Sequence, residues 1–467
     1  MYDIFRIKDI GHKAPENGTA VLKRTMGTMD MIMLGVGCVI GTGIFVLTGV
    51  AAARYAGPGI MLSFLLAGLA CLFTALAYSE LASMVPLAGT VYAYSYVALG
   101  EIVAWATGWS LILEYSVGAG VVASGWSGYV TGLINGAGIT LPHALTAIPT
   151  NGGIVNLPAV LIVLMLSLLL IRGTRESSTL NKVLVVIKLS VIVAFIAMAM
   201  PFVDTANWEP LIPFGFLGVA QGAAIIFFAY TGFDTVATAA EECRNPRRDL
   251  PIGIIVSLLI CTILYILVAA VLTGVVDYHS LDTAAPVTFA LNALGNPIGA
   301  ALVGIGAVAG ITTVLLGLMY GQSRVLFSMS RDGLIPAGVC KIHKSFGTPY
   351  KLTIIVGIFV SIVAGFMPLS NMAELANIGV LFPFIVASTA AMILRLTKPE
   401  AERPFRCPLL FVVAELAIFF CSILIFTLRL NTWLMFIGWM VLGALIYIGY
   451  GYHNSILVKQ KVAKENS

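Results

Sequence analysis

The sequence GVGCVIGTGIF, residues 35–45, decides how the chain folds, because it places Gly35, Gly37, Gly41 and Gly43 within one apolar stretch. Each glycine costs about 0.5–1 kcal/mol relative to alanine in a helix interior. The stretch therefore predicts a helix that is broken near its middle. Close packing against a neighbouring helix, as in small-xxx-small motifs, is the alternative role for these glycines.

A second apolar stretch carries a similar interruption. Its sequence FFAYTGFD, residues 227–234, sets Gly232 between aromatic residues and an acid. At such a break, unpaired N–H groups and the positive end of a helix dipole attract an anionic group, while freed carbonyls can hold an ammonium group. A zwitterionic amino acid carries both charges.

The composition of the 467-residue chain predicts a polytopic membrane protein. Hydrophobic residues make up 59% of the chain and charged residues 10%, with a mean hydropathy of +0.99, whereas soluble domains carry about 25% charged residues. A helix that crosses a bilayer needs about 20 apolar residues. Twelve such stretches are predicted, at 30–55, 59–85, 97–130, 156–172, 180–202, 216–240, 251–275, 297–328, 352–368, 372–395, 408–428 and 432–452.

The two interruptions lie five stretches apart, so the second copy of a five-helix unit enters the membrane from the opposite side. The predicted fold is all-α, with two inverted repeats, residues 30–202 and 203–396, followed by two further spans in 397–452. Residues 1–29 and 453–467 are predicted cytoplasmic ends. Broken helices at corresponding positions of inverted repeats indicate a midplane site in a secondary transporter.

The distribution of basic residues predicts the orientation of the chain. With a cytoplasmic N-terminus, 23 of the 26 Lys and Arg residues fall in inside segments, and only Arg54, Lys188 and Arg429 do not. This positive-inside bias places both termini in the cytoplasm of a multi-pass cell-membrane protein. The net charge of +4 therefore follows topology and does not indicate a nucleic-acid partner; the lipid bilayer is the predicted environment.

The sequence contains no motif that indicates a metal site, a cofactor site or an enzyme active site. There is no HExxH and no CxxC, and the cysteines are predicted to be free thiols. All five histidines fall in predicted loops or tails: His12, His143, His279, His343 and His453. A channel would need rings of charge or carbonyl filters along a pore, whereas the intramembrane charges here are few and scattered. No cofactor and no metal are predicted.

Lys188 lies inside the apolar run VLVVIKLSVIVAFIAMAM, residues 183–200. A lysine at the centre of a membrane helix costs about 2.5–3.5 kcal/mol, and such residues usually mark ion or proton pathways. The alternative is that the Lys188 side chain extends to the nearer interface and has no further role.

Several motifs in order resemble one family over nearly the whole chain. They are GVGCVIGTGIFVLTG from residue 35, AGP at 56–58, YSELASMVPLAGTVYAYSY at 78–96, GWSLILEY at 108–115, FFAYTGFD followed by EECRNPRRDLPIGI, and SRDGLIP at 330–336. The chain is similar to the amino acid, polyamine and organocation transporters, and within them to the bacterial permeases that resemble cationic amino acid transporters. This resemblance implies the LeuT-type fold.

The resemblance implies a substrate site at the two breaks. The substrate carboxylate would be held by the first break, at Gly41, Thr42 and Gly43. The amino group would be held by freed carbonyls, which on this chain match Val39, Phe228, Ala229 and Thr231. Phe228 or Tyr230 would close over the substrate as a gate, although simple packing is the alternative for an aromatic residue.

The resemblance also gives Lys188 a role in coupling. Proton-coupled members place a fifth-span lysine amine where sodium-coupled relatives hold a cation between the first and eighth spans. The eighth span here reads AGITT, residues 309–313, which makes Thr312 and Thr313 the predicted partners of the Lys188 amine. The coupling ion is accordingly predicted to be a proton rather than sodium.

Three acids in predicted spans have separate interpretations. Glu114 matches a position characteristic of the subfamily and is predicted to relay protons or contact the substrate region; a buried protonated acid is the alternative. Asp234 would bind the N–H groups exposed at the second break or contact substrate. Glu415 lies outside the ten-helix core, and we interpret it as a packing or dimer residue. Arg331 and Asp332 are predicted to pair as a cytoplasmic gate.

The functional prediction is proton-coupled import of an L-amino acid by alternating access. Amino acid exchange without net proton movement and a transporter-like amino acid sensor are the alternatives. The apolar surroundings of Ala229 and Thr231 favour a neutral substrate, whereas Glu114 and Asp234 leave a cationic one open. The sequence does not indicate whether a small membrane accessory subunit binds.

Overall fold

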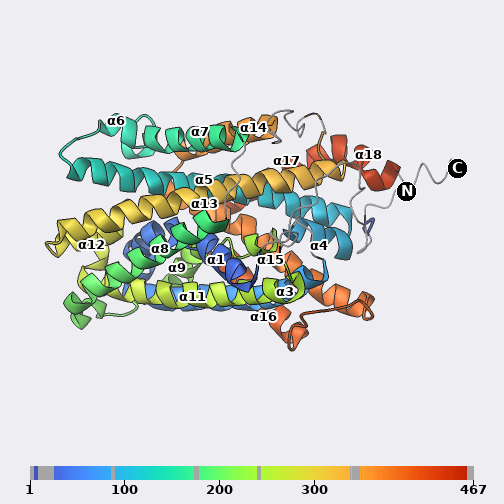
Figure 1. The fold of residues 1–467 in the computed structure, drawn as a ribbon, viewed down its shortest axis with the longest axis horizontal. Helices are drawn as coiled ribbons and strands as arrows, with labels where there is room; N and C mark the ends of the chain where they lie inside the picture. Colours follow the sequence, from blue (N-terminus) through green and yellow to red (C-terminus); the bar gives the residue numbers. More distant parts are fainter. Residues whose placement is uncertain are drawn as a thin grey trace.

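The computed structural model describes residues 5–8, 26–85, 90–172, 178–238, 243–336, 338, 348 and 350–459. Within these residues every regular element is helical, and the one extended pairing is an isolated bridge between Met26 and Cys243. The predicted all-α class is therefore confirmed for the described part of the chain. Figure 1 shows the long helices lying side by side along the long axis of one bundle.

The long helices coincide with the predicted apolar stretches. They are α3 (Ile60–Met84), α5 (Glu101–Gly136), α7 (Leu157–Arg172), α8 (Ser178–Ala199), α11 (Pro246–Val275), α13 (Pro297–Arg331), α14 (Tyr350–Phe366), α15 (Leu369–Thr397), α16 (Leu410–Phe426) and α17 (Leu430–Ile446). The first and sixth stretches are instead divided into shorter pieces. Further short helices that the sequence did not predict include α4 (Thr90–Ala98), α6 (His143–Thr146), α12 (Pro286–Ala293) and α18 (Tyr452–Asn454).

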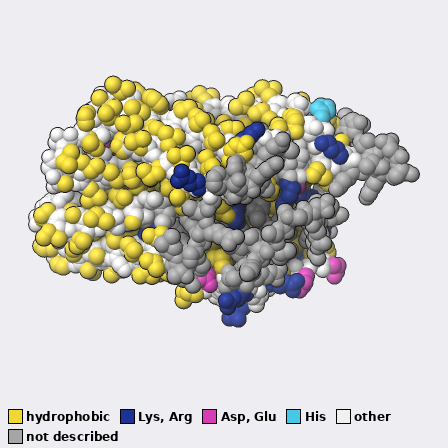
Figure 2. All heavy atoms as spheres, turned by 45° about the horizontal axis from the view of Figure 1, so that its top comes forward, with side chains coloured by type: hydrophobic (Ala, Val, Ile, Leu, Met, Phe, Trp, Pro, Cys, Tyr) yellow, Lys and Arg dark blue, Asp and Glu magenta, His cyan; other side chains and the backbone are white. Residues whose placement is uncertain are grey.

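Many of the described helices have the length and composition of membrane spans. Eight helical segments are long and apolar enough to cross a bilayer, and four shorter apolar helices accompany them. Large hydrophobic side chains such as Met165 and Leu168, exposed by 63% and 64%, lie on the outer surface. Figure 2 shows hydrophobic side chains over most of the left part of one face, whereas the visible Lys and Arg side chains lie at its middle and right. Contact with lipid explains such a surface, because large apolar patches are unfavourable in water.

The divided helices lie at the centre of the bundle. The piece α1 (Thr28–Val39) packs against α8, α11 and α13, and α9 (Gly215–Ile226) packs against α3, α15 and α16. The remaining helices form a wall around them, in which α5 contacts both α13 and α15 extensively. The breaks are therefore shielded from the outer surface by complete helices.

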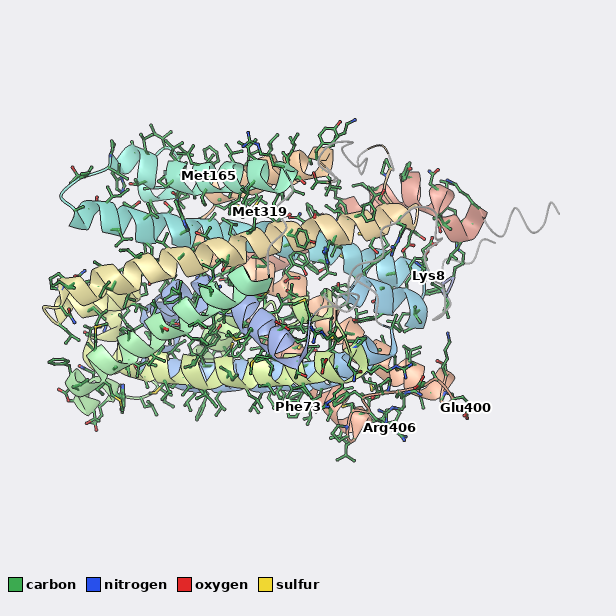
Figure 3. All side chains as sticks on the ribbon, viewed as in Figure 1. Lys8, Phe73, Met165, Met319, Glu400 and Arg406 are labelled. Atoms are coloured by element: carbon green, nitrogen blue, oxygen red, sulfur yellow. The ribbon has the colours of Figure 1, made fainter. Side chains whose placement is uncertain are left out.

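Basic and acidic residues close one end of the bundle. Arg6 donates to Glu101 at 3.0 Å, and the Lys8 amine lies 2.7 Å from Asp332 Oδ1. Figure 3 shows Lys8 at this end, together with Glu400 and Arg406. The predicted pairing of Arg331 with Asp332 is wrong, since the Asp332 carboxylate is taken by Lys8 and by the hydroxyl of Tyr92.

Candidate substrate and coupling site

The first break begins where α1 ends at Val39. Ile40 has φ −75° and ψ 104°, an extended conformation that stops the helix. The chain then turns through Gly41 and Thr42 into a π-helical segment, Gly43–Leu47, which continues as α2 (Thr48–Ala51). The break thus falls inside the glycine-rich stretch, where helical propensity is lowest.

The second break follows α9. A 3₁₀ turn, Phe227–Tyr230, ends at Thr231 in an extended conformation, and α10 (Thr235–Thr238) begins four residues later. Gly232 has φ +109°, a value that side-chain-bearing residues rarely adopt. A glycine is therefore required at this point of the turn.

The two breaks touch each other through their backbones. A Cβ atom added at Gly43 would lie 2.3 Å from Ala229 Cα, and one added at Gly232 would lie 2.9 Å from the carbonyl oxygen of Cys38. Such distances leave no room for a side chain. Two of the glycines that weaken the helices therefore also permit the two broken segments to meet.

Tyr265 of α11 links the two breaks. Its hydroxyl lies 2.9 Å from the carbonyl oxygen of Val39 and 2.8 Å from that of Ala229, and it can donate to either. Sequence reasoning missed this residue. The available signal is a tyrosine in the middle of the apolar run ICTILYILVAA, because a phenol inside a membrane helix needs a polar partner.

We expect Tyr265→Phe to lower the thermal unfolding temperature, because the carbonyls of Val39 and Ala229 would lose the one donor that they share. A hydrogen bond contributes about 0.5–1.5 kcal/mol, and an unsatisfied buried group costs about 1–3 kcal/mol. Thermal unfolding in detergent measures the change. Tyr278→Phe is the matched control, since the Tyr278 hydroxyl makes no hydrogen bond among the described residues. Equal unfolding temperatures for the two variants would contradict the linking role.

Thr42 presents an unused hydroxyl at the first break. The side chain is 1% exposed, and Oγ1 has no hydrogen-bond partner within the described part of the chain. Thr42 directly precedes the π-helical segment, whose first N–H groups lack helical partners. Hydroxyl and backbone donors together form a place where an anionic group can bind.

Three of the four carbonyls predicted to hold an amino group have partners within the chain. Those of Val39 and Ala229 share the single O–H donor of Tyr265, and that of Phe228 accepts from the Thr231 hydroxyl at 2.8 Å. An ammonium group at this place would therefore share or displace these donors. These carbonyls lie together at the two breaks, where an amino group could donate hydrogen bonds to them only in competition with Tyr265 and Thr231.

Asn377 of α15 supports the second break and was also missed. Its side-chain amide donates to the carbonyls of Ala224 and Ile225, which the end of α9 leaves without helical donors. The residue is fully buried and its Oδ1 has no partner in the described structure. A lone asparagine in an apolar run was the available signal.

The two predicted gate residues face different helices. The Tyr230 hydroxyl donates to the Phe64 carbonyl at 2.8 Å, and its ring packs against that of Tyr265 with centroids 5.3 Å apart. Phe228 instead lies beside Gly118 of α5, where an added Cβ would be 3.2 Å from its ring. Tyr230 is thus held in the wall, and Phe228 is the better placed of the two to move.

Lys188 reaches from α8 to the end of α1. Its amine donates to the carbonyls of Gly37 at 2.8 Å and Ile40 at 3.3 Å, and the residue is 1% exposed. The aliphatic stem passes over Gly310 of α13, where an added Cβ would lie 2.9 Å from Lys188 Cγ. The alternative that Lys188 extends to an interface is wrong, because its amine ends at the first break.

Thr312 and Thr313 use their hydroxyls elsewhere. Thr312 accepts from the Trp126 indole at 2.9 Å and donates to the Val308 carbonyl, and Thr313 donates to the Gly310 carbonyl. The hydrogen bonds between Lys188 and α1 are made without either hydroxyl.

Glu114 and Asp234 belong to one buried polar neighbourhood. They are 3% and 1% exposed, and each has one carboxylate oxygen without a partner among the described residues. The Asp234 carboxylate also accepts from backbone N–H groups of its own turn, including that of Thr235. Its charge acts on Glu114 and on Tyr78 and Tyr115, so these four buried groups form one electrostatic neighbourhood.

Other candidate chemistry lies away from the breaks. Glu415 is exposed on α16 and takes no part in the site. Within the described ranges no group of three or more His, Cys, Asp or Glu residues is placed to hold a metal ion, and the six cysteines there are free thiols. Cys340, His12 and His343 lie outside the described residues.

Comparisons with known proteins identify the relatives of the chain. The sequence profile described as amino acid permease matches residues 26–447. A methylthioribose transporter of Bacillus subtilis (strain 168) is 44% identical over 98% of this chain and 100% of its own length. A branched-chain amino acid permease of the same organism is 45% identical over 97% of this chain and 99% of its own. The vacuolar cationic amino acid transporter 4 of Arabidopsis thaliana is 35% identical over 86% and 68%.

Proposed function

Because this chain belongs to the amino acid permease family, and is thus a multi-pass membrane transporter and not an enzyme, we propose that it imports L-amino acids with protons by alternating access. The observation that carries the proposal is the meeting of two broken helices at buried, partly unsatisfied groups. Thr42 has an unused hydroxyl there, and Lys188 places an amine on carbonyls of the same break.

The proposed architecture is the LeuT-type fold with twelve spans. Residues 30–202 and 203–396 form the two inverted five-helix repeats, and 397–452 form the last two spans. Both termini lie in the cytoplasm. In support, residues 5–8 pack at the same end of the bundle as Tyr447, whose hydroxyl donates to Glu101, and several arginines lie at this end.

The substrate carboxylate is assigned to the N–H groups at Gly41–Gly43 and to the Thr42 hydroxyl, and the amino group to the carbonyls of Val39, Phe228, Ala229 and Thr231. A neutral side chain is favoured, because Phe228 and Gly118 bring apolar surface to the breaks. The branched-chain amino acid permease at 45% identity supports a neutral substrate. The unpartnered oxygens of Glu114 and Asp234 support the cationic alternative.

The coupling ion is assigned as a proton rather than sodium. A sodium ion at the first break would need the same carbonyl oxygens that Lys188 already binds. Loss of a proton from the amine would weaken both hydrogen bonds, since charge-assisted bonds are roughly twice as strong as neutral ones. Protonation of Lys188 would thereby change the stability of the broken segment and shift the balance between outward-open and inward-open states.

Uptake into sodium-free proteoliposomes tests the proposal. Labelled alanine, leucine, arginine and methylthioribose are supplied with and without an inward proton gradient. Gradient-stimulated uptake of leucine or alanine is expected. Uptake only into vesicles preloaded with amino acid would support the exchanger, binding without uptake would support the sensor, and uptake of methylthioribose alone would overturn the amino acid assignment.

We expect Thr42→Val to weaken binding of every transported amino acid without changing the order of preference. The substitution removes one donor to the carboxylate that all substrates share, and hydrogen bonds to charged groups contribute about 1.5–3 kcal/mol. The dissociation constant should rise by roughly 10- to 150-fold. Binding measured for alanine and leucine checks this, and a change in their ratio would place Thr42 at the side-chain end of the substrate.

A further inference from the structure

A cavity of about 400 Å³ opens on the bundle surface at the end where α11 begins. We call it the α11 groove. One wall is the start of α11 and the other is the loop between α15 and α16, and the lining includes Arg247, Arg248, Ile252, Ile255, Pro404 and Phe405. The charged residues Arg247 and Arg248 form the mouth of the groove, and apolar residues such as Ile252 and Ile255 form its floor. The groove therefore suits a ligand with a polar and an apolar part.

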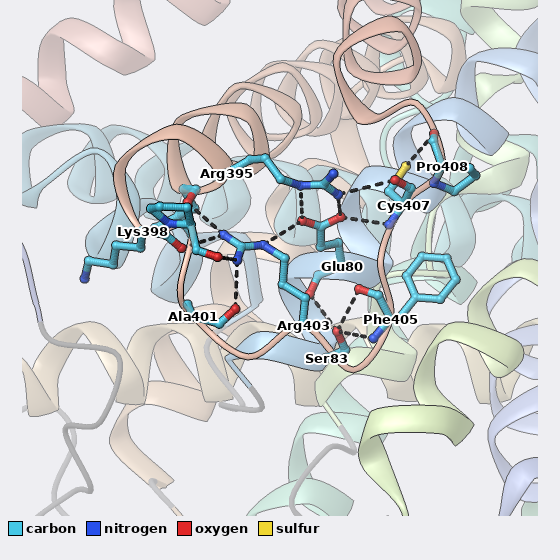
Figure 4. A network of polar contacts seen from close by, with 11 residues as sticks. Glu80, Ser83, Arg395, Lys398, Ala401, Arg403, Phe405, Cys407 and Pro408 are labelled. Carbon is cyan, nitrogen blue, oxygen red and sulfur yellow. Dashed lines mark hydrogen bonds and ion pairs between the residues drawn. The ribbon is translucent and has the colours of Figure 1, made fainter.

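The loop wall of the groove is held in place by a buried carboxylate. Glu80 of α3 accepts from Arg395 Nε at 3.0 Å and from the backbone N–H of Cys407 at 2.8 Å, and Arg403 Nε lies 3.2 Å from it (Figure 4). The backbone N–H of Phe405 also donates to the Ser83 hydroxyl. The groove is therefore formed before any ligand arrives.

Among the described residues at the mouth of the groove, two arginines face one carboxylate. Arg247 is paired in a bidentate manner with Glu402, at 2.5 and 2.9 Å, and both side chains are exposed. Arg248 is exposed and makes no ion pair within the described residues. The neighbouring Asp249 points inward and accepts from the Thr28 hydroxyl at 2.7 Å. Among the described residues, the Arg248 guanidinium is thus available to a ligand, and the Arg247 guanidinium is paired with Glu402, an exposed carboxylate that an anionic ligand can replace.

The floor of the groove continues along the outer face of α11. Ile255 is followed at helical spacing by Leu259, Ile263 and Leu267, which are exposed by 45%, 61% and 44%. Residues three and four apart lie on one face of a helix. An apolar stripe therefore leads from the two arginines toward the centre of the membrane.

We propose that the α11 groove binds an anionic phospholipid of the leaflet on this side of the membrane. The phosphate group would bind Arg248 and, by exchange with Glu402, Arg247, since guanidinium groups recognise phosphate through paired N–H donors. One acyl chain would follow the apolar stripe of α11. Basic pockets beside membrane helices are suited to such headgroups. The proposal does not depend on which substrate the protein transports.

Native mass spectrometry of the full-length protein in detergent tests the site. The protein is titrated with phosphatidylglycerol or with phosphatidylcholine, which shares the phosphate but has no net charge. We expect stronger retention of phosphatidylglycerol, and about 25-fold weaker retention by the Arg247→Ala, Arg248→Ala double variant, from roughly five-fold for each arginine. Arg172→Ala with Arg331→Ala is the matched control, because both residues are exposed arginines at helix ends.

Two further variants separate headgroup from chain binding. Glu402→Gln should strengthen retention of phosphatidylglycerol, because it releases Arg247. Ile255→Trp should weaken retention of both lipids by filling the floor. Wild-type retention of phosphatidylglycerol by the double arginine variant would overturn the site, as would equal retention of the two lipids by the wild type. A change of oligomeric state without a change in lipid retention would assign the groove to a contact between copies.

Discussion

Lys188→Ala is expected to abolish uptake driven by a proton gradient while leaving substrate binding or exchange measurable. The substitution removes the only side-chain amine that contacts Gly37 and Ile40 in the described structure. Under the proposed coupling, an imposed pH difference would then no longer change the stability of the first break. Uptake into proteoliposomes, with and without the gradient, measures the effect against exchange in preloaded vesicles.

The controls for this variant separate coupling from folding. Two buried carbonyls lose their donor, at about 1–3 kcal/mol each, so thermal unfolding and substrate binding are measured in parallel. Lys351→Ala, at an exposed position of α14, is the matched loss of one lysine and should transport as the wild type does. Full proton dependence in a folded Lys188→Ala protein would remove Lys188 from the coupling mechanism.

The features of the site that the sequence predicted are those that depend on residues close together in the chain. Glycine density marked the first break, and Gly232 marked the second, because helix propensity depends on neighbouring residues. Lys188 stood out since a single charge in an apolar run has few explanations. The helical stretches were visible for the same reason: hydropathy is read over one continuous window.

The features that sequence missed depend on contacts between distant segments. Tyr265 meets Val39 across 226 residues and Ala229 across 36, and no periodicity within α11 indicates either partner. Thr312 and Thr313, the partners that the resemblance predicts for Lys188, each donate to a carbonyl of their own helix, and the Lys188 amine donates to carbonyls at the first break. Which donor meets which acceptor is decided by packing, because several buried groups compete for the same partners.

Gly43→Ala is expected to abolish transport, although alanine is the better helix former. In an unconstrained helix the change would stabilise by about 0.5–1 kcal/mol. At Gly43 the added Cβ would lie 2.3 Å from Ala229 Cα, and overpacking of this kind costs about 1–3 kcal/mol or more. The steric term therefore exceeds the propensity gain, and the two breaks are forced apart. Uptake and thermal unfolding measure the two consequences.

Gly132→Ala and Gly317→Ala are the matched controls, because an added Cβ at either position meets nothing within 4 Å. Both should keep transport and match or exceed wild-type stability. Ala229→Gly in the Gly43→Ala background tests what the new methyl group strikes. It removes Cβ but leaves the Cα atom at 2.3 Å, so little rescue is expected. Full rescue would show that the two backbones can separate without loss of function, and that their direct contact is not what builds the site.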